Sequence, residues 1–313
     1  MTGERVEVAA AVIERPDGAF LMASRPEGKV YAGWWEFPGG KIEVGESARA
    51  ALERELAEEL GLTVTQSYPW LNREFDYAHA RVRLRFFRVT GWRGEPHPHE
   101  GQGGLAWVSD AAAPALAPIL PANGPILKAL SLPLRYAISA AETLGETVFL
   151  QSLDIALAGG LRLLLLREKT LPRAAFAALA ETVAARCRAH GARLIVHGDV
   201  ELAARLGAGV HLSSAALMSL TARPPLAWVG ASCHDAAELA RAAELALDFV
   251  VLGPVRPTAS HPGAPALGWA RFAELVRDYS LPVFALGGLT DADLDTARQH
   301  GAQGIALRGA AWS

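Results

Sequence analysis

The 313-residue chain has only two cysteines, Cys187 and Cys233, and no run of about 20 apolar residues. Two cysteines without metal-ligand spacing exclude a disulfide framework and a cysteine-based metal site. The missing apolar run excludes a transmembrane helix, and the N-terminal segment lacks the apolar core of a signal peptide. Together these absences favour a cytoplasmic protein.

The chain also has little excess of charge of either sign. Thirty Lys and Arg residues nearly balance 33 Asp and Glu residues, which gives a formal net charge of −3. Such a balance provides no bulk attraction to a nucleic acid or a membrane surface, so we expect neither partner. A phosphate-bearing substrate must therefore be held by local cations or by a metal. The length suggests about two domains.

The first part of the chain is predicted to contain mixed strands and few helices. Val6–Ile13 is an apolar run typical of a buried strand, and Asp17-Gly18 predicts a turn into a return strand at Ala19–Ala23. Ser47–Leu60 has helical periodicity, and Gly61 follows where a helix C-terminal cap belongs. Two further strands are predicted at Arg81–Val89 and Leu105–Val108, and a short helix at Pro125–Leu130.

After Leu134 the pattern changes, because short apolar strands alternate with alanine-rich helices such as Arg173–His190 and Asp235–Ala246. This alternation favours a (β/α)8 TIM barrel, with an open α/β sheet as the alternative. With Ser131-Leu132-Pro133 as the linker, we predict domains at 1–131 and 134–313. The eight predicted strands are Arg135–Ile138, Leu161–Leu166, Arg193–Val196, Gly209–Leu212, Ala227–Gly230, Phe249–Leu252, Val283–Ala285 and Gly304–Leu307.

Crowded carboxylates mark the predicted helix at Ser47–Leu60. Glu55, Glu58 and Glu59 stand at i, i+3 and i+4 and share one helix face, where they repel one another. A hard divalent cation, Mg²⁺ or Mn²⁺, relieves this repulsion and retains waters for substrate phosphates. Arg54 precedes Glu58 by four residues and is expected to pair with it.

A glycine loop precedes this helix. Gly39 and Gly40 let the backbone approach the metal without a side chain in the way, and a backbone carbonyl there is expected to complete the coordination shell. The metal is expected to hold the phosphates, polarise a phosphoryl oxygen and lower the pKa of an attacking water.

These residues resemble a known motif. Gly40, Glu46 and the segment 54–62 (RELAEELGL) fill the nine constrained positions of the Nudix box over 23 residues. The segments 35–43 (WEFPGGKIE), 92–96 (WRGEP) and 121–123 (PAN) are similar to MutT-type Nudix hydrolases. The resemblance covers residues 4–130 and implies an α/β/α sandwich with a mixed sheet.

The resemblance also implies roles for individual residues. Glu58 and Glu59 would ligate the metal together with the carbonyl of Gly40, and Glu55 would bind the metal or orient the water. Glu100 would be a further ligand or a base. Asn123 would read the purine edge, since an amide both donates and accepts, although a turn or helix-cap role remains an alternative. The other residues assigned to substrate binding are Arg25, Phe37, Gly39, Lys41 and either Phe75 or Tyr77; Lys41 also fits a solvated surface position.

The implied reaction is attack of water on the β-phosphorus of a nucleoside triphosphate, with a nucleoside monophosphate and pyrophosphate as products. For the MutT type the expected substrate is 8-oxo-dGTP, and the expected role is cleansing of the nucleotide pool. Three alternatives stay open. They are hydrolysis of another diphosphate, such as one of the thiamine pathway, a bifunctional protein with an active barrel, and a binding or sensor protein.

The second part, from Leu134 to Ser313, resembles the thiamine phosphate synthase and TenI barrels. The segments 166–169 (LREK), 209–212 (GVHL), 230–234 (GASCH) and 285–289 (ALGGL) carry the resemblance. Such barrels place ligands at the carboxyl ends of their strands. A phosphorylated ligand is therefore expected at Arg167, Lys169, Ser232, Thr258, Gly287 and Gly288, with a pair of surface cations as the alternative for Arg167 and Lys169.

The barrel departs from the synthase pattern at the positions that matter for a diphosphate. The synthase motif has Asn-Asp where this chain has His197-Gly198, and a second aspartate near Ala216. Leu165 replaces a glutamine, and His261 replaces a lysine. Without both metal carboxylates, a diphosphate leaving group cannot be handled in that way. We therefore expect the barrel to bind a phosphate ligand, to regulate or to serve a structural role.

Overall fold

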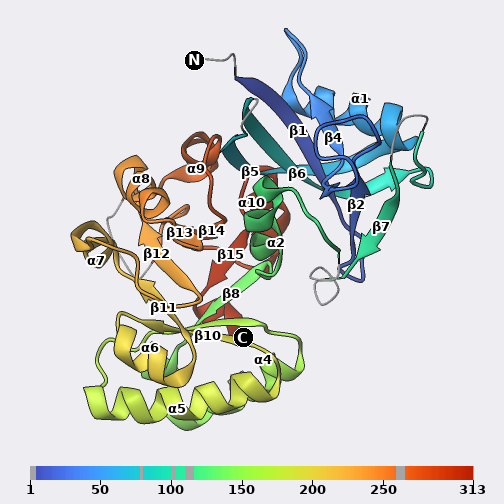
Figure 1. Ribbon diagram of the computed structural model, residues 1–313. Helices are drawn as coiled ribbons and strands as arrows, with labels where there is room; N and C mark the ends of the chain where they lie inside the picture. The colour runs from blue at the N-terminus through green and yellow to red at the C-terminus, as the bar shows by residue number, and fades with distance from the viewer. Residues whose placement is uncertain (1–4, 78–79, 100–102, 110–115, 259–264, 313) are drawn as a thin grey trace. The chain divides into compact units, whose positions relative to one another are not determined.

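A computed structural model describes residues 5–77, 80–99, 103–109, 116–258 and 265–312. The chain forms two compact units. The first comprises Met1–Ser131 with Asp278–Ser280, and the second comprises Leu132–Arg277 with Leu281–Ser313. Figure 1 labels their helices and strands. No helix among the described ranges combines the length and apolar character needed to cross a membrane.

Two small sheets build the first unit. One has the order β4-β1-β6-β5 and the other the order β3-β2-β7. In the larger sheet β1 runs parallel to β6 and antiparallel to β4, so the sheet is mixed, as predicted. The strands are β1 (Val6–Ile13), β2 (Phe20–Ser24), β3 (Trp35–Glu36), β4 (Gly39–Lys41), β5 (Thr63–Asp76), β6 (Arg81–Arg93) and β7 (Leu105–Val108).

Helices cover both faces of β1. Because side chains alternate along a strand, Ala10 and Val12 point to one face while Ala11 and Ile13 point to the other. The first face packs with Ile126 of α2 (Gly124–Leu130), which follows the 3₁₀ turn η2 (Pro121–Asn123). The second packs with the apolar face of α1 (Ala48–Leu60). This burial on both sides explains the continuous apolar run of β1 and forms the predicted α/β/α sandwich.

The ends of α1 are set by local chemistry. The Ser47 hydroxyl accepts a hydrogen bond from the backbone N–H of Ala50 at 3.1 Å, which satisfies one of the free amides of the first turn. Gly61 ends the helix with φ 68°, and its N–H donates to the carbonyl of Ala57. The capping role predicted for Gly61 is confirmed, since a residue with a Cβ is disfavoured in this left-handed conformation.

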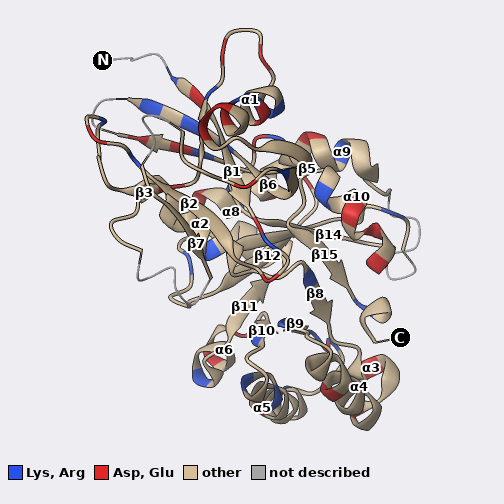
Figure 2. Ribbon diagram, turned by 90° about the vertical axis from the view of Figure 1, so that its right-hand side faces the viewer, with Lys and Arg blue, Asp and Glu red and all other residues tan. Residues whose placement is uncertain are grey.

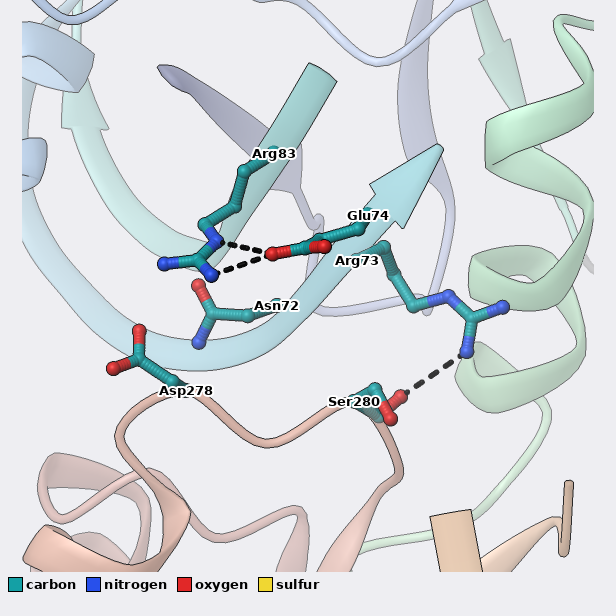
Figure 3. A pocket seen from close by; sticks show the side chains of 6 residues that line it. All are labelled: Asn72, Arg73, Glu74, Arg83, Asp278 and Ser280. Atoms are coloured by element: carbon teal, nitrogen blue, oxygen red, sulfur yellow. Dashed lines mark hydrogen bonds and ion pairs between the residues drawn. The ribbon is translucent and has the colours of Figure 1, made fainter. Parts of the chain in front are cut away.

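Three strands of the first unit were not predicted. Gly39 and Gly40, expected in a loop, form β4 opposite Ala10 and Ala9, where pairing rests on backbone bonds that leave no side-chain pattern. β3 is too short to show a period. β5 pairs with β6 through three register shifts, which destroy the alternation of apolar and polar residues. The ion pair of Glu74 and Arg83 marks the regular part of this pairing (Figure 3).

The second unit is a closed eight-stranded parallel barrel, so the open-sheet alternative is wrong. The order is β10-β11-β12-β13-β14-β15-β8-β9, in which β15 pairs with β8 and closes the ring. Large side chains such as Tyr136, Phe249 and Phe284 fill the interior. The strands are β8 (Arg135–Ile138), β9 (Leu163–Leu166), β10 (Arg193–His197), β11 (Gly209–Leu212), β12 (Val229–Cys233), β13 (Phe249–Leu252), β14 (Val283–Leu286) and β15 (Gly304–Leu307).

The bounds of β12 differ from the prediction by two to three residues. Ser232 and Cys233, expected after the strand, belong to it because they pair with Val251 and Leu252 of β13. The barrel helices are α3 (Ala141–Leu144), α4 (Glu146–Ala158), α5 (Arg173–Ala189), α6 (Val200–Leu206), α7 (Ser214–Ser219), α8 (Ala236–Glu244), α9 (Gly268–Val276) and α10 (Leu294–Gln299), with 3₁₀ turns η3 (Asp291–Asp293) and η4 (Gly309–Ala311).

Replacement of Gly39 tests the packing of β4 against β1. A Cβ at Gly39, whose φ is 141°, would lie 2.1 Å from the Ala9 carbonyl oxygen, whereas one at Gly45, whose φ is 83°, would meet nothing within 4 Å. We expect Gly39→Ala to destabilise the first unit by about 3 kcal/mol and Gly45→Ala by about 1 kcal/mol. Urea unfolding with hydrogen exchange of the β1 peptide measures both, and equal losses would contradict the packing argument.

Candidate functional site

One arginine organises the acidic face of α1. The guanidinium of Arg54 bonds Glu46 twice, with Nε to Oε1 at 3.1 Å and Nη2 to Oε2 at 3.0 Å. Its Nη1 contacts Glu55 Oε1 at 2.9 Å and Glu58 Oε2 at 3.2 Å, and Nη2 also donates to the Lys41 carbonyl at 3.1 Å. The ion pair predicted between Arg54 and Glu58 is therefore present, within a larger network. Figure 2 shows acidic and basic residues together on α1.

This network changes the explanation of the crowded carboxylates. We attributed relief of their repulsion to a divalent cation, but Arg54 itself neutralises part of the charge of Glu46, Glu55 and Glu58. The hydrogen bonds from Arg54 lower the pKa of Glu46, and the contacts with Glu46 and Glu55 raise the pKa of Arg54. Glu46 and Arg54 thus stay charged over the physiological range.

Gly40 lies directly against Glu55. A Cβ on Gly40 would come within 2.1 Å of the carboxyl carbon of Glu55, so only glycine leaves room for that carboxylate beside β4. The Glu55 side chain is 14% exposed, whereas that of Glu58 is 61% exposed and Glu59 is half-buried. Helix α1 and strand β4 therefore bring Gly40 and Glu55 together, and Arg54 links Glu55 to Glu58, while Glu100 lies outside the described residues.

The chemistry of these donors fits a hard cation. Gly40 offers a backbone carbonyl, and Glu55, Glu58 and Glu59 offer carboxylates, all of them oxygen ligands of the kind that Mg²⁺ and Mn²⁺ prefer. Within the described ranges, no three His, Cys, Asp or Glu side chains already converge as a metal-binding group. Glu58 in particular is solvated, so its side chain can reorient without breaking into the core.

A second polar group lies in the same unit. Arg25 Nη1 contacts both carboxylate oxygens of Glu36 at 2.9 and 2.8 Å, and its Nε donates to the Val30 carbonyl at 2.7 Å. Burial raises the pKa of Glu36, and Arg25 opposes that rise. Because the charge of Arg25 is already balanced by Glu36, Arg25 is poorly suited to neutralise a substrate phosphate.

Aromatic rings adjoin this ion pair. The alternatives Phe75 and Tyr77 stand together, with ring centroids 4.6 Å apart, and Tyr31 lies 5.7 Å from Tyr77. Burial, and then the Glu36 carboxylate, raise the pKa of Tyr77, which also forms a backbone hydrogen bond with Ala122. Sequence reasoning assigned no role to Tyr31, which lies outside the quoted motifs, or to Glu36, which lies within the similar segment 35–43.

Asn123 occupies the turn next to this group. It is 4% exposed and lies in the η2 turn at the N-cap position of α2, as the turn or helix-cap alternative predicts, although its side chain makes no capping hydrogen bond. Phe37 is also buried and packs in the core within 5.9 Å of the rings of Phe20 and Phe86, which gives it a structural role. Lys41 is exposed, as its alternative surface position predicts.

The predicted barrel residues follow the carboxyl ends of several strands. Arg167 and Lys169 follow β9, Ser232 lies in β12, Thr258 follows β13, and Gly287 and Gly288 follow β14 with φ values of 109° and 62°. Burial lowers the pKa of Arg167, and the like charge of Arg308 adds to this effect. Lys169 is exposed.

A chain of neutral polar groups lies beside these cations. The ring of His211 joins Tyr136 and Ser232, with Nδ1 3.3 Å from the tyrosine hydroxyl and Nε2 2.9 Å from Ser232 Oγ. Burial, with smaller contributions from nearby positive charges such as Arg167, lowers the pKa of His211 to about 3 and that of the neighbouring His197 to about 4. Nδ1 of His197 is buried without a hydrogen-bond partner. Sequence reasoning did not predict this network, because its members are spread over three strands.

Comparison with known families assigns both parts of the chain. A model described as NUDIX domain matches residues 9–129, and one described as thiamine monophosphate synthase matches residues 135–311, more than half of the chain. The chain belongs to the Nudix and thiamine monophosphate synthase families.

Curated relatives match each part separately. The Nudix domain is 41% identical over 124 residues to CTP pyrophosphohydrolase of Escherichia coli. The matched region covers 40% of this chain and 90% of the relative. It is 36% identical over 125 residues to 8-oxo-dGTP diphosphatase of Haemophilus influenzae, with the same two coverages, 40% and 90%. The barrel is 37% identical over 177 residues to thiamine-phosphate synthase of Thiobacillus denitrificans. That matched region covers 55% of this chain and 83% of the relative. The chain thus carries a Nudix hydrolase domain of the pyrophosphohydrolase kind.

Acidic groups near the mouth of the synthase-family barrel serve the fold. Asp199, two residues after His197, accepts a hydrogen bond from Leu202 N at 2.9 Å and caps α6. Glu168 accepts bonds from the backbone amides of Ala141 and Glu142 at 2.9 and 2.8 Å. These carboxylates do not replace the two that the synthase pattern places at Gly198 and Ala216, so the residues here do not fit the metal site of that pattern.

Substitution of Arg54 tests the acidic network of the Nudix domain. An ammonium group cannot reach Glu46, Glu55, Glu58 and the Lys41 carbonyl at once, so we expect Arg54→Lys to lower the melting temperature of the domain by roughly 5 °C. Arg49→Lys is the control, because Arg49 makes only an exposed pair with Glu53 at 2.9 Å on the same helix. Similar melting temperatures for the two variants would contradict the organising role of Arg54.

The neutral histidines predict an acid-sensitive barrel. The folded pKa values of His197 and His211 lie below the unfolded value of about 6.5, so unfolding takes up protons and stability falls as pH drops from about 6.5 towards 4. We expect His197→Asn to reduce this uptake by about one proton. Chemical unfolding of both proteins between pH 5 and 7 measures the difference, and parallel pH profiles would show that His197 is already protonated in the fold.

Proposed function

We propose that the Nudix domain, residues 1–131, hydrolyses oxidised purine nucleoside triphosphates, with 8-oxo-dGTP as the preferred substrate. The products are 8-oxo-dGMP and pyrophosphate, and the role is to cleanse the nucleotide pool. The observation that carries the proposal is the contact of Glu55 with Gly40 and with Arg54 at the middle of the acidic helix. We assign residues 134–313 to a separate barrel domain.

The base-recognition part of the proposal rests on Asn123. Asn123 is buried and follows Ala122, whose backbone forms a hydrogen bond with Tyr77, and its side chain makes no capping bond to α2. A buried amide that can donate and accept suits the edge of a base that presents both kinds of group, and an unpaired amide would penalise bases with the wrong pattern. The similarity to an 8-oxo-dGTP diphosphatase agrees with an oxidised purine.

The reaction follows from the acidic face of α1. Water adds to the β-phosphorus, the bond from that phosphorus to the oxygen bridging to the α-phosphate breaks, and the nucleoside monophosphate leaves with that oxygen. Gly40, Glu55, Glu58 and Glu59 would hold a divalent cation, Mg²⁺ or Mn²⁺, which would supply charge stabilisation and polarise a phosphoryl oxygen. Arg54 occupies Oε1 of Glu55, so we assign Oε2 to the metal or to orientation of the water. Glu100 is assigned as a further ligand or base.

A pyrimidine substrate is the specific rival, because the CTP pyrophosphohydrolase of E. coli is equally covered and slightly more identical to this chain. Cytosine also presents a donor and an acceptor along one edge, so Asn123 alone does not separate the two. Discrimination between an oxidised purine and cytosine must therefore come from the size of the base and from the protein groups that surround it. A thiamine-pathway diphosphate remains a further candidate because of the fused barrel.

The barrel is proposed to bind a phosphorylated ligand without synthase chemistry. Arg167 and Lys169 supply positive charge, Ser232 and Thr258 supply hydroxyls, and Gly287 and Gly288 let backbone amides approach a phosphate. The two carboxylates needed to hold a metal diphosphate are missing at Gly198 and Ala216, and His197 stands in place of the asparagine of the synthase pattern. This departure from the synthase pattern favours a ligand that the barrel binds but does not cleave.

A substrate panel tests the Nudix proposal. Pyrophosphate or phosphate release is measured for 8-oxo-dGTP, dGTP, CTP and thiamine diphosphate with Mg²⁺ or Mn²⁺. We expect the largest kcat/KM for 8-oxo-dGTP, and a loss of about a hundredfold or more in Glu58→Gln. Glu53→Gln is the matched control, because Glu53 lies on α1 but pairs only with Arg49. A larger kcat/KM for CTP, or full activity of Glu58→Gln, would refute the proposal.

A further inference from the structure

Tyr31 has an unusual backbone conformation. Its φ is 64°, and Ala246 is the one other non-glycine residue with a positive φ in the described part of the chain. An aromatic residue with a Cβ is strained in this left-handed region, where glycine or asparagine is the common choice. Strain of this kind persists where the surrounding structure holds it and where the position of the side chain matters.

Hydrogen bonds close the loop that carries Tyr31. The backbone N–H groups of Arg25 and Gly33 donate to the carbonyls of Trp34 and Arg25, each at 2.8 Å. The Arg25 side chain also donates to the Val30 carbonyl at 2.7 Å, and the Trp34 N–H donates to the Tyr31 carbonyl at 3.1 Å. The loop is thus held at its base and at its tip, and the Tyr31 ring has a defined direction.

That direction brings Tyr31 into the aromatic group. Its ring centroid is 5.1 Å from that of Trp34 and 5.7 Å from that of Tyr77, which in turn lies 4.6 Å from Phe75. All four rings are only half-buried. Since a purely structural aromatic cluster gains most from complete burial, four partly exposed rings indicate a surface available for a planar ligand.

We propose that Tyr31 is a specificity-determining residue of the Nudix site, whose ring stacks with the nucleobase and selects substrates that carry one. This inference rests on the proposed function and extends it. Stacking against an aromatic ring contributes to affinity for any base, because every base has a π-face. Tyr31 therefore favours nucleotides over phosphate esters without a base, while Asn123 distinguishes among bases by hydrogen bonding.

The test compares substrates with and without a base. Tyr31→Gly is the central variant, because glycine adopts a φ of 64° without strain, and Tyr31→Phe keeps the ring without its hydroxyl. We expect Tyr31→Gly to raise KM for 8-oxo-dGTP about tenfold and to leave KM for deoxyribose 5-triphosphate unchanged. Tyr31→Phe should match the wild type within about twofold, as should the neighbouring control Val30→Ala, whose side chain is 55% exposed.

Each outcome separates stacking from a structural role. An unchanged KM for 8-oxo-dGTP in Tyr31→Gly, or an equal rise for both substrates, overturns the inference. A lowered melting temperature of Tyr31→Gly with poor turnover of both substrates assigns Tyr31 to the fold and also overturns it. If the wild type hydrolyses no nucleoside triphosphate, the proposed function itself is wrong. If the wild type is active but substitution of Tyr31 does not change its KM, only the inference about Tyr31 is wrong.

Discussion

The bonding of Arg54 to five oxygen atoms is the interaction on which the Nudix site depends. One planar guanidinium joins the loop before α1 through Glu46, strand β4 through the Lys41 carbonyl, and α1 itself through Glu55 and Glu58. The spacing of the Nudix box agrees with this geometry, because the residue after Gly40, the first glutamate and the helix all reach the guanidinium of Arg54. The carboxylates are therefore oriented before any substrate arrives, which reduces the reorganisation that binding requires.

Periodic segments could be predicted from the sequence, and segments held by backbone pairing could not. The apolar run of β1, the leucine face of α1 and the eight barrel strands have patterns that burial imposes, and their predicted positions agree with the structure. β4 consists of two glycines and a lysine, and β5 contains register shifts, so neither shows alternation. A side-chain pattern reports burial, and these strands depend on hydrogen bonds instead.

The site residues likewise divide into contacts that could be predicted from the sequence and contacts that could not. The pairing of Arg54 with Glu58 was predictable because helix geometry relates residues four apart, while its two bonds to Glu46 depend on how the loop folds back. Tyr31 carries no motif, and its importance is visible only in its backbone angle and its neighbours. In the barrel, His211 and Ser232 lie on the paired strands β11 and β12, but Tyr136 of β8 reaches His211 only because the sheet closes.

Closure of the barrel has a consequence for how such a chain can be assembled. The first strand, at Arg135, and the last, ending at Leu307, are neighbours in one continuous ring. Because the first and last strands are adjacent, the chain enters and leaves the barrel at the same place. A segment added at either end therefore interrupts none of the eight strand pairings. This geometry explains in physical terms how a synthase-type barrel tolerates an entire hydrolase joined to its first strand through a linker of only a few residues.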